Sequence, residues 1–284
     1  MVRPLPVRSA VKQTLPDPAP HAVGVPLTST RSPRVQAVRR LTRRSARAAE
    51  RRFVVEGPQA VREALPTLVE LYADPDGEQR FPELLAAAPC PVTRVSRDVL
   101  VAMAETVTPQ GVLGVAPLLD VDLATALTGV PRLVAVCEAV GDPGNAGTVI
   151  RTADAAGAGA VVLTEGSTDP HGGKCVRATA GSLWHLPVVS GPTLAETVQA
   201  LRTAGLTVLA TSGAGQDDLD DLQDRGELTG PTAWLLGTEA AGLSEQALAL
   251  ADRTVRIPLH GRAESLNLAT AAAVCLYASA RAQR

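Results

Sequence analysis

Three segments of the chain place polar side chains directly after a short apolar run and before a helical pattern. Their chemically informative residues are Asn145 and Arg151, then Gly237 and Glu239, and finally Ser265 and Asn267. Backbone N–H groups at the start of a helix are unpaired and bind polar ligands, and a guanidinium holds a phosphate or a ribose hydroxyl. If the three loops meet in space, they form one shared pocket.

Each segment taken alone has a simpler explanation. Asn145 could be only a helix N-cap with Arg151 as a surface side chain, and Glu239 could cap the helix that follows it. Ser265 and Asn267 could likewise cap the last helix. Arg151, however, lies among valine, isoleucine and alanine, so its helix face is not generically polar. The combination of three such segments favours a ligand pocket over three separate caps.

Other classes of active site lack their motifs. A Rossmann dinucleotide site needs its glycines between a strand and a helix, whereas Gly157-Ala158-Gly159 precedes a strand. Gly172-Gly173-Lys174 lacks the spacing of a Walker loop, and no Gly-x-Ser-x-Gly hydrolase elbow occurs. The four histidines and four cysteines show no metal-ligand spacing. We therefore expect no metal and free thiols in a reducing compartment.

The elements that must position these residues alternate between short apolar strands and helices from residue 132 onward. The expected strands are Leu133–Cys137, Ala160–Leu163, Val188–Val189, Thr207–Ala210, Thr232–Leu236 and Thr254–Ile257. Wholly apolar strands separated by helices predict a parallel sheet that is covered on both faces. Ligands bind such sheets beyond the carboxyl ends of the strands, where all three polar segments fall. The predicted class is α/β.

The first half of the chain has a different organisation. Residues 1–30 hold six prolines and little apolar periodicity, which predicts a flexible tail. Residues 31–117 read as a small α/β unit that begins with a helix over residues 33–47, and residues 118–131 read as a linker. No apolar run approaches the roughly 20 residues that cross a bilayer, and no signal-peptide core is present at the start. These features predict a cytoplasmic protein.

Positive charge is concentrated in one segment of a chain whose net charge is −2. Residues 31–62 contain ten arginines and two glutamates, a local charge of +8. A basic block on a mildly acidic protein is a candidate nucleic-acid surface. The alternatives are a solvated helix face or an arginine bias from a GC-rich genome. The candidate phosphate contacts are Arg39, Arg40, Arg43, Arg44 and Arg47.

Together the three segments resemble the sequence motifs of the SpoU (TrmH) family of RNA ribose 2′-O-methyltransferases. The matching residues are Asn145, Gly147 and Arg151-Thr152-Ala153, then Gly237, Glu239 and Gly242, and then Ile257-Pro258 with Ser265-Leu266-Asn267. The basic segment Lys174–Leu183 also resembles the helix that lies between the family's motifs. One departure is Ala240, where the family often has glycine. The resemblance covers residues 132–284, and residues 33–117 resemble the family's small substrate-binding domain.

The resemblance implies a SPOUT methyltransferase domain with a deep trefoil knot at residues 132–284. A ribosomal-protein-like RNA substrate-binding domain at 31–117 would precede it. It implies S-adenosyl-L-methionine as cofactor, a homodimer with a site completed across the interface, and no metal. The implied cofactor contacts are Thr211, Gly237, Ile257, Leu259 and Leu266. The implied catalytic group comprises Arg151, Asn145, Glu239, Ser265 and Asn267.

The expected reaction is transfer of a methyl group from S-adenosylmethionine to a ribose 2′-hydroxyl in RNA. The N-terminal unit resembles that of ribosomal-RNA members, including the thiostrepton- and avilamycin-resistance subgroup, so 23S ribosomal RNA is the expected substrate. Transfer RNA as substrate, or a non-catalytic RNA-binding or assembly factor with the same fold, are the alternatives. Because a guanidinium loses its proton only above about pH 12, Arg151 is expected to hold a phosphate and stabilise alkoxide charge.

Overall fold

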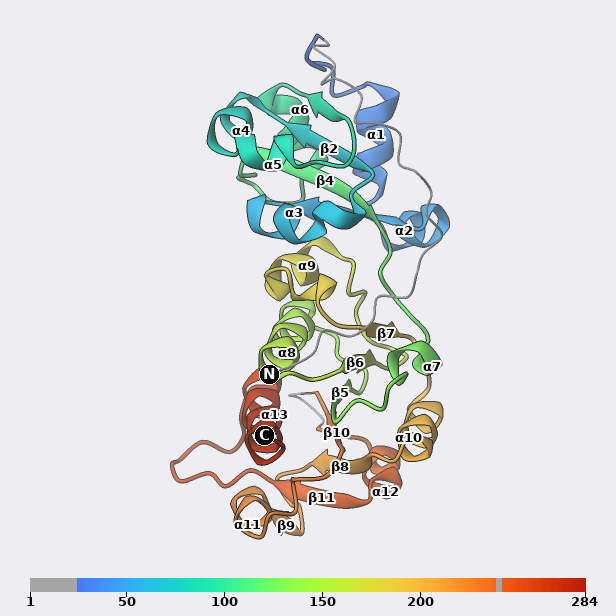
Figure 1. Ribbon diagram of the computed structural model, residues 1–284, viewed down its shortest axis with the longest axis vertical. Coiled ribbons are helices and arrows are strands. Elements are labelled where there is room, and N and C mark those ends of the chain that lie inside the picture. Colours follow the sequence, from blue (N-terminus) through green and yellow to red (C-terminus); the bar gives the residue numbers. More distant parts are fainter. Residues whose placement is uncertain (1–24, 239–241) are drawn as a thin grey trace.

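The computed structural model describes residues 25–238 and 242–284. These residues form two sheets, which lie one after the other along the long axis of the molecule (Figure 1). A four-stranded sheet of order β1-β4-β2-β3 lies in the N-terminal part, and a seven-stranded sheet of order β7-β6-β5-β10-β8-β11-β9 lies in the C-terminal part. Most of residues 1–30, predicted to be a flexible tail, and Glu239 lie outside the described residues.

The N-terminal sheet is mixed, because β1 and β2 both pair antiparallel with β4 while β2 and β3 run parallel. Its strands are β1 Arg52–Glu56, β2 Glu70–Ala73, β3 Val92–Arg94 and β4 Val112–Pro117. Its helices are α1 Pro33–Arg40, α2 Arg44–Glu50, α3 Pro58–Ala64, α4 Pro75–Arg80, α5 Pro82–Ala86 and α6 Arg97–Met103.

Every pair of neighbouring strands in the C-terminal sheet is parallel, which confirms the predicted α/β class with a parallel sheet. Its strands are β5 Leu133–Cys137, β6 Ala160–Leu163, β7 Val188–Ser190, β8 Thr207–Thr211, β9 Asp217–Asp218, β10 Thr232–Leu236 and β11 Arg253–Arg256. Its helices are α7 Leu123–Ala126, α8 Pro143–Ala156, α9 Gly173–Thr179, α10 Leu194–Thr203, α11 Leu219–Asp224, α12 Glu245–Leu250 and α13 Leu268–Ala282. The knot stays a prediction of the resemblance.

The last helix is fixed to the centre of the C-terminal sheet. Trp234 on β10 is fully buried, and its indole Nε1 donates a hydrogen bond of 2.9 Å to Ser279 Oγ on α13. A buried indole N–H needs such a partner, because an unmade hydrogen bond costs free energy there. This contact, near the end of α13, and the packing of α13 against α8 and β10 fix the helix against the sheet.

The single helix predicted over residues 33–47 is broken into α1 and α2. The carbonyl oxygens of Leu41 and Thr42 at the break accept hydrogen bonds from Arg47 Nη1 at 2.9 and 2.8 Å. The helix predicted over Lys174–Leu183 also ends early, because Ala180 and Gly181 have φ values of 49° and 102°. Left-handed residues cannot continue a right-handed helix.

Arg47 also joins the two parts of the molecule. Its Nε and Nη2 atoms donate to Asp169 Oδ2 at 2.9 and 2.7 Å, and its side chain is only 6% exposed. Asp169 Oδ1 accepts from the His171 backbone N–H, and His171 Nε2 accepts from the Leu119 N–H. The ring of Phe53 on β1 packs edge-on against His171. Three distant segments therefore meet at one buried ion pair.

Replacing Arg47 by alanine is expected to lower the free energy of unfolding by about 3 kcal/mol, because Asp169 is left as an uncompensated, largely buried charge. Urea titration followed by circular dichroism measures the change. The control is Arg44→Ala, an exposed position on the same helix, where a change within about 0.5 kcal/mol is expected. Equal losses in the two variants would contradict the role given to this ion pair.

The Arg47–Asp169 ion pair also predicts a pH dependence. Burial by itself would raise the pKa of Asp169, but hydrogen bonds from His171 and Arg47 outweigh it and the pKa lies far below its ordinary value. The stabilisation is therefore present above the unfolded-state pKa of about 3.9 and is lost as the pH falls below it.

No helix among residues 25–238 and 242–284 is long and apolar enough to cross a membrane. The predicted linker has secondary structure, since it contains α7. It also contacts the edge of the sheet, where the Val121 N–H donates to the Val188 carbonyl.

Candidate cofactor pocket and active site

A cavity of about 320 Å³ lies beyond the carboxyl ends of β8, β10 and β11, three neighbouring strands of the parallel sheet. Its walls come from the loops that follow these strands and from the start of α13. The segment between β11 and α13 makes a long excursion away from the sheet before the chain returns to the helix (Figure 1). The cavity is therefore at the edge where ligands bind open α/β sheets.

The structure brings together the residues predicted to contact a cofactor. Thr211 follows β8, Gly237 follows β10, and three apolar residues lie between β11 and α13. The predicted residues that line the cavity are Thr211, Gly237, Ile257, Leu259 and Leu266. Ser265 lines it as well, together with Glu264, which sequence reasoning did not single out.

The loop after β10 is closed on itself by two backbone hydrogen bonds. The Thr238 N–H donates to the Gly242 carbonyl at 3.0 Å, and the Gly242 N–H donates back at 2.8 Å. A Cβ atom on Gly237 would lie 2.2 Å from the carbonyl carbon of Gly242 and 2.3 Å from the nitrogen of Leu243. Only glycine fits at position 237, which explains the glycine of this motif.

Glu138 anchors the far end of the same loop, and sequence reasoning missed it. It follows β5 directly, and its carboxylate accepts hydrogen bonds from the Ser244 N–H at 2.9 Å and from Ser244 Oγ at 2.5 Å. Ser244 Oγ in turn caps α12 by accepting from the Ala247 N–H. Glu138 could have been found from the sequence as an acidic residue at the carboxyl end of a predicted strand, where polar side chains converge.

Glu138→Ala is expected to raise the KM for S-adenosylmethionine about tenfold, since two hydrogen bonds to a carboxylate that hold the cavity wall are lost. The kcat at saturating cofactor should change much less. Steady-state methyl transfer measures both constants. Glu165→Ala is the matched control, an exposed glutamate just beyond the neighbouring β6. An unchanged KM in Glu138→Ala would contradict the anchoring role.

The starts of α8 and α13 are joined by their asparagines. Asn267 Nδ2 donates to Asn145 Oδ1 at 3.2 Å, and Asn267 Oδ1 caps α13 by accepting from the Ala269 and Thr270 N–H groups. Asn145 itself is not the N-cap of α8, contrary to the simpler reading of that segment. Asp142 is the cap, since its Oδ1 accepts from the Asn145 N–H at 2.8 Å.

Asp142 has a second partner on α9. Its Oδ2 accepts from Lys174 Nζ at 2.7 Å. The hydrogen bond from Lys174, and then the one from the Asn145 N–H, lower the pKa of the Asp142 carboxyl below its ordinary value. The carboxylate is thus charged at neutral pH and links the starts of α8 and α9.

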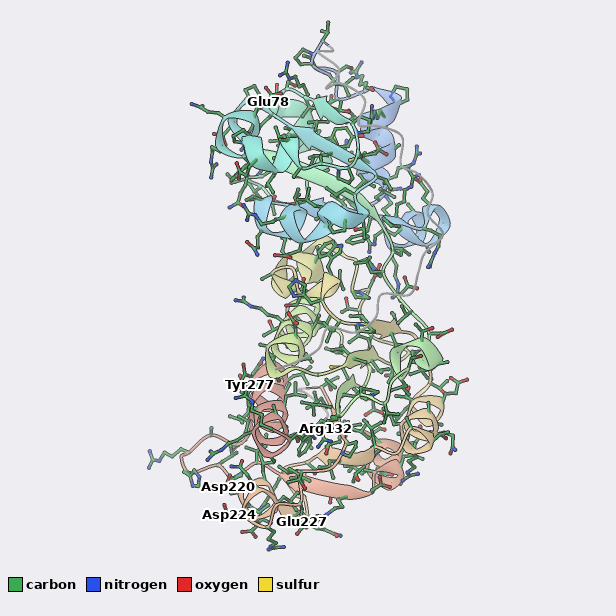
Figure 2. All side chains as sticks on the ribbon, viewed as in Figure 1. Glu78, Arg132, Asp220, Asp224, Glu227 and Tyr277 are labelled. Carbon is green, nitrogen blue, oxygen red and sulfur yellow. The ribbon has the colours of Figure 1, made fainter. Side chains whose placement is uncertain are left out.

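Arg151 lies on the exposed side of α8, about 9 Å along the helix from Asn145. It does not line the cavity formed by its own chain, and no residue that the structure describes bonds its guanidinium. On α13, Val274 and Tyr277 are 38% and 49% exposed, and both line a surface cavity together with residues of α11. Tyr277 lies on the outer side of this helix (Figure 2). The predicted catalytic arginine is therefore exposed on α8 and lies outside the cavity of its own chain.

The five arginines predicted to contact phosphate have different environments. Arg39, Arg43 and Arg44 are exposed and make no ion pair with any described residue. Arg40 is exposed, with Glu50 3.8 Å away. Arg47 is the exception to the prediction, because its guanidinium is buried and fully used by Asp169 and two carbonyl groups. Its place in the structure is at the junction of the two parts.

The cysteines and the metal-ligating residue types give no further site. Within the described part of the chain, no group of three or more His, Cys, Asp or Glu side chains is arranged to hold a metal ion. The cysteines are free, as expected. Burial raises the pKa of the Cys137 and Cys175 thiols to about 12, so both stay protonated at neutral pH.

The fold and the pocket define an α/β protein that binds a small ligand at the carboxyl ends of three parallel strands and carries a basic N-terminal unit. Residues 132–277 match the family model described as the SpoU rRNA Methylase family, and residues 32–114 match the MRM3-like substrate binding domain. The chain belongs to the SpoU rRNA methylase family, which confirms the family predicted from the motifs.

One relative is similar over most of the chain and another over about half of it. It is 36% identical over 257 residues to the 23S rRNA (guanosine(2553)-2′-O)-methyltransferase RlmP of Bacillus subtilis, with 88% of this chain and 97% of the relative covered. It is 41% identical over 144 residues to the 23S rRNA (uridine(2479)-2′-O)-methyltransferase of Streptomyces viridochromogenes, with 49% of each chain covered.

Two solved structures are similar over most of this chain. The AdoMet-bound rRNA methyltransferase from Sinorhizobium meliloti has a TM-score of 0.78 at 32% identity, with 90% of this chain and 97% of that chain covered. The SpoU methyltransferase AviRb from Streptomyces viridochromogenes, in complex with AdoMet, has a TM-score of 0.78 at 31% identity, with 88% and 98% covered. The chain therefore has the architecture of AdoMet-binding methyltransferases.

Proposed function

We propose that this protein transfers a methyl group from S-adenosylmethionine to a ribose 2′-hydroxyl of 23S ribosomal RNA, in the cytoplasm. The observation that carries the proposal is the convergence of five motif residues on one cavity at the strand ends. The relatives named for 2′-O-methylation of 23S rRNA support the substrate class.

The cavity suits the cofactor in size and chemistry. Its volume is at the lower end of the roughly 300–1,000 Å³ of small-molecule sites. Backbone groups around Gly237 come close to the ligand space because no side chain intervenes, and Ile257, Leu259 and Leu266 supply apolar contact. When bound, S-adenosylmethionine supplies a methyl group on a sulfonium centre. Thr211 forms part of the cavity wall, but its hydroxyl proton is not available to the ligand, since Oγ1 donates it to the Leu235 carbonyl.

In this proposal Arg151 binds the RNA phosphate next to the target ribose and stabilises negative charge on the 2′-oxygen. A guanidinium is charged at any physiological pH and presents a planar fork of donors, so it suits this role better than that of a base. Asn145 and Asn267 fix the starts of α8 and α13 on either side of the ribose. Ser265 and Glu239 complete the group as positioning residues for the motif loops.

A homodimer explains why Arg151 does not line the cavity of its own chain. Val274 and Tyr277 are exposed apolar residues of α13, the helix that packs against α8, and we place the contact surface of the dimer on this helix. A second copy seated there brings its Arg151 toward the cavity, so that each active site contains residues of both chains. The RNA then extends over the arginines of α1 and α2, with Arg39, Arg43 and Arg44 as the phosphate contacts.

Two measurements test the proposed function. Isothermal titration calorimetry is expected to show S-adenosylmethionine binding, and its failure would favour a non-catalytic RNA-binding factor. Tritium transfer from labelled cofactor is then compared between ribosomal RNA and transfer RNA. Preferential labelling of transfer RNA would overturn the substrate class while leaving the enzyme class intact.

A further inference from the structure

A second cavity, of about 330 Å³, lies where the N-terminal part meets α9. We call it the junction cavity. Its informative lining residues are Gln59, Thr106, Thr108, Gln110, Arg177 and Ala180. It shares no lining residue with the cofactor cavity.

The junction cavity is a built feature of the fold. Glu56, at the end of β1, is only 7% exposed and fixes the loop over residues 105–110. Its carboxylate accepts from the Glu105 N–H at 2.7 Å, the Thr106 N–H at 3.2 Å and Thr106 Oγ1 at 2.8 Å. Gly57 has a φ of +87°, and a Cβ there would come within 3.3 Å of Gln110 Oε1. The wall of the cavity is thus held by a buried carboxylate, and the positive φ at position 57 favours glycine.

Gln59, Thr108 and Gln110 line the junction cavity with exposed side chains that a ligand can reach. The side chains of Thr108 and Gln110 make no hydrogen bond to any residue that the structure describes, and Gln59 reaches only Glu63, at 3.5 Å. Arg177 Nη1 is buried without a hydrogen-bond partner among those residues, although Glu56 Oε2 lies 3.4 Å away. Because Glu56 offsets the arginine charge, the cavity suits a neutral, planar ligand with donors and acceptors rather than a phosphate.

Helix α9 connects the junction cavity to the proposed active site. Arg177 lies three residues, or about 4.5 Å along the helix axis, beyond Lys174. Lys174 is bonded to Asp142, which caps the helix that carries Asn145 and Arg151. The junction cavity therefore lies beside the helix whose first residues are bonded to the start of α8, the helix that carries Asn145 and Arg151.

We infer that the junction cavity holds the base of one unpaired nucleotide of the RNA substrate, near the methylated nucleotide. Unpaired bases are recognised by hydrogen bonds to their edges and by stacking on planar side chains, including guanidinium groups. Gln110, Thr108 and Gln59 contact the base edge, and Arg177 stacks on its face. The inference rests on the proposed function and adds a residue-level source of sequence selectivity to it.

The test uses Gln110→Ala with a 23S rRNA fragment in which each unpaired nucleotide near the target is changed in turn. The KM for the unchanged RNA is expected to rise about tenfold, with the KM for S-adenosylmethionine unchanged. The wild-type protein should discriminate among bases at one position, and the variant should lose that discrimination. Thr108→Ala provides a second variant with the same expectation, and Gln79→Ala, an exposed glutamine on α4, is the control.

If Gln110→Ala or Thr108→Ala has the same KM for RNA and the same base discrimination as Gln79→Ala, the substituted residue does not contact the base. If both variants behave like Gln79→Ala, the inference is overturned. Absence of methyl transfer by the wild-type protein would instead overturn the proposed function. The two failures are therefore distinguishable in one series of measurements.

Discussion

Arg151→Ala is expected to abolish methyl transfer to ribosomal RNA, with a loss of at least about 100-fold in kcat. The affinity for S-adenosylmethionine should stay at the wild-type value, because Arg151 does not line the cavity of its own chain. Arg151→Lys should recover little, since an ammonium group lacks the planar fork that binds phosphate. Single-turnover transfer of a labelled methyl group measures the rate, and calorimetry measures the affinity.

Arg225→Ala, an exposed arginine just beyond α11, is the control and should transfer methyl groups at the wild-type rate. Wild-type activity in Arg151→Ala would refute the role assigned to this arginine. A loss of cofactor affinity would place Arg151 in the cofactor site rather than beside the RNA.

Gly237→Ala is expected to lower the affinity for S-adenosylmethionine by at least about 100-fold and to remove activity with it. The added Cβ would lie 2.2–2.3 Å from the backbone of Gly242 and Leu243, so the cavity wall must move. Overlap with backbone atoms cannot be relieved by a rotamer change, and such shifts cost about 1–3 kcal/mol or more. Calorimetric titration of the folded variant measures the affinity.

Gly230→Ala is the matched control, because a Cβ there meets nothing within 4 Å and the residue precedes β10 at the opposite end of the strand. Both glycine variants should keep the circular dichroism spectrum of the wild type. Cofactor binding by Gly237→Ala at the wild-type affinity would show that the loop after β10 does not bound the cofactor site.

The two variants together test the dimeric site. Mixed and allowed to exchange subunits, Arg151→Ala and Gly237→Ala should recover about a quarter of wild-type activity, because half the dimers are mixed and each has one intact composite site. No recovery after exchange would mean that Arg151 acts within its own chain.

Much of the cofactor pocket could be predicted from the sequence, because its residues lie in three short motifs with fixed spacing. The anchoring role of Glu138 could not be predicted, because its partner Ser244 is 106 residues away and no local pattern connects them. The same limit explains Arg47. Its charge and helical position suggested a phosphate contact, but Asp169, 122 residues away, sequesters it in the folded protein.

The fold was predictable where burial dictates composition. The mainly apolar strands of the parallel sheet were found, whereas β9 was missed because it is the acidic pair Asp217 and Asp218. That strand depends on arginines of β11, since Arg253 Nη2 bonds Asp217 Oδ1 at 2.7 Å and Arg256 Nε bonds Asp218 Oδ2 at 3.1 Å. Pairing between distant charges leaves no periodic signal in either segment.

The protein is expected to place the methyl group on a ribose 2′-oxygen of 23S rRNA. The most direct measurement incubates the purified protein with 23S rRNA and tritiated S-adenosylmethionine, digests the RNA to nucleosides and separates them by chromatography. We expect the label in a single kind of 2′-O-methylnucleoside, and none with Arg151→Ala. Label in a base-methylated nucleoside, or no incorporation by the wild-type protein, would contradict the account.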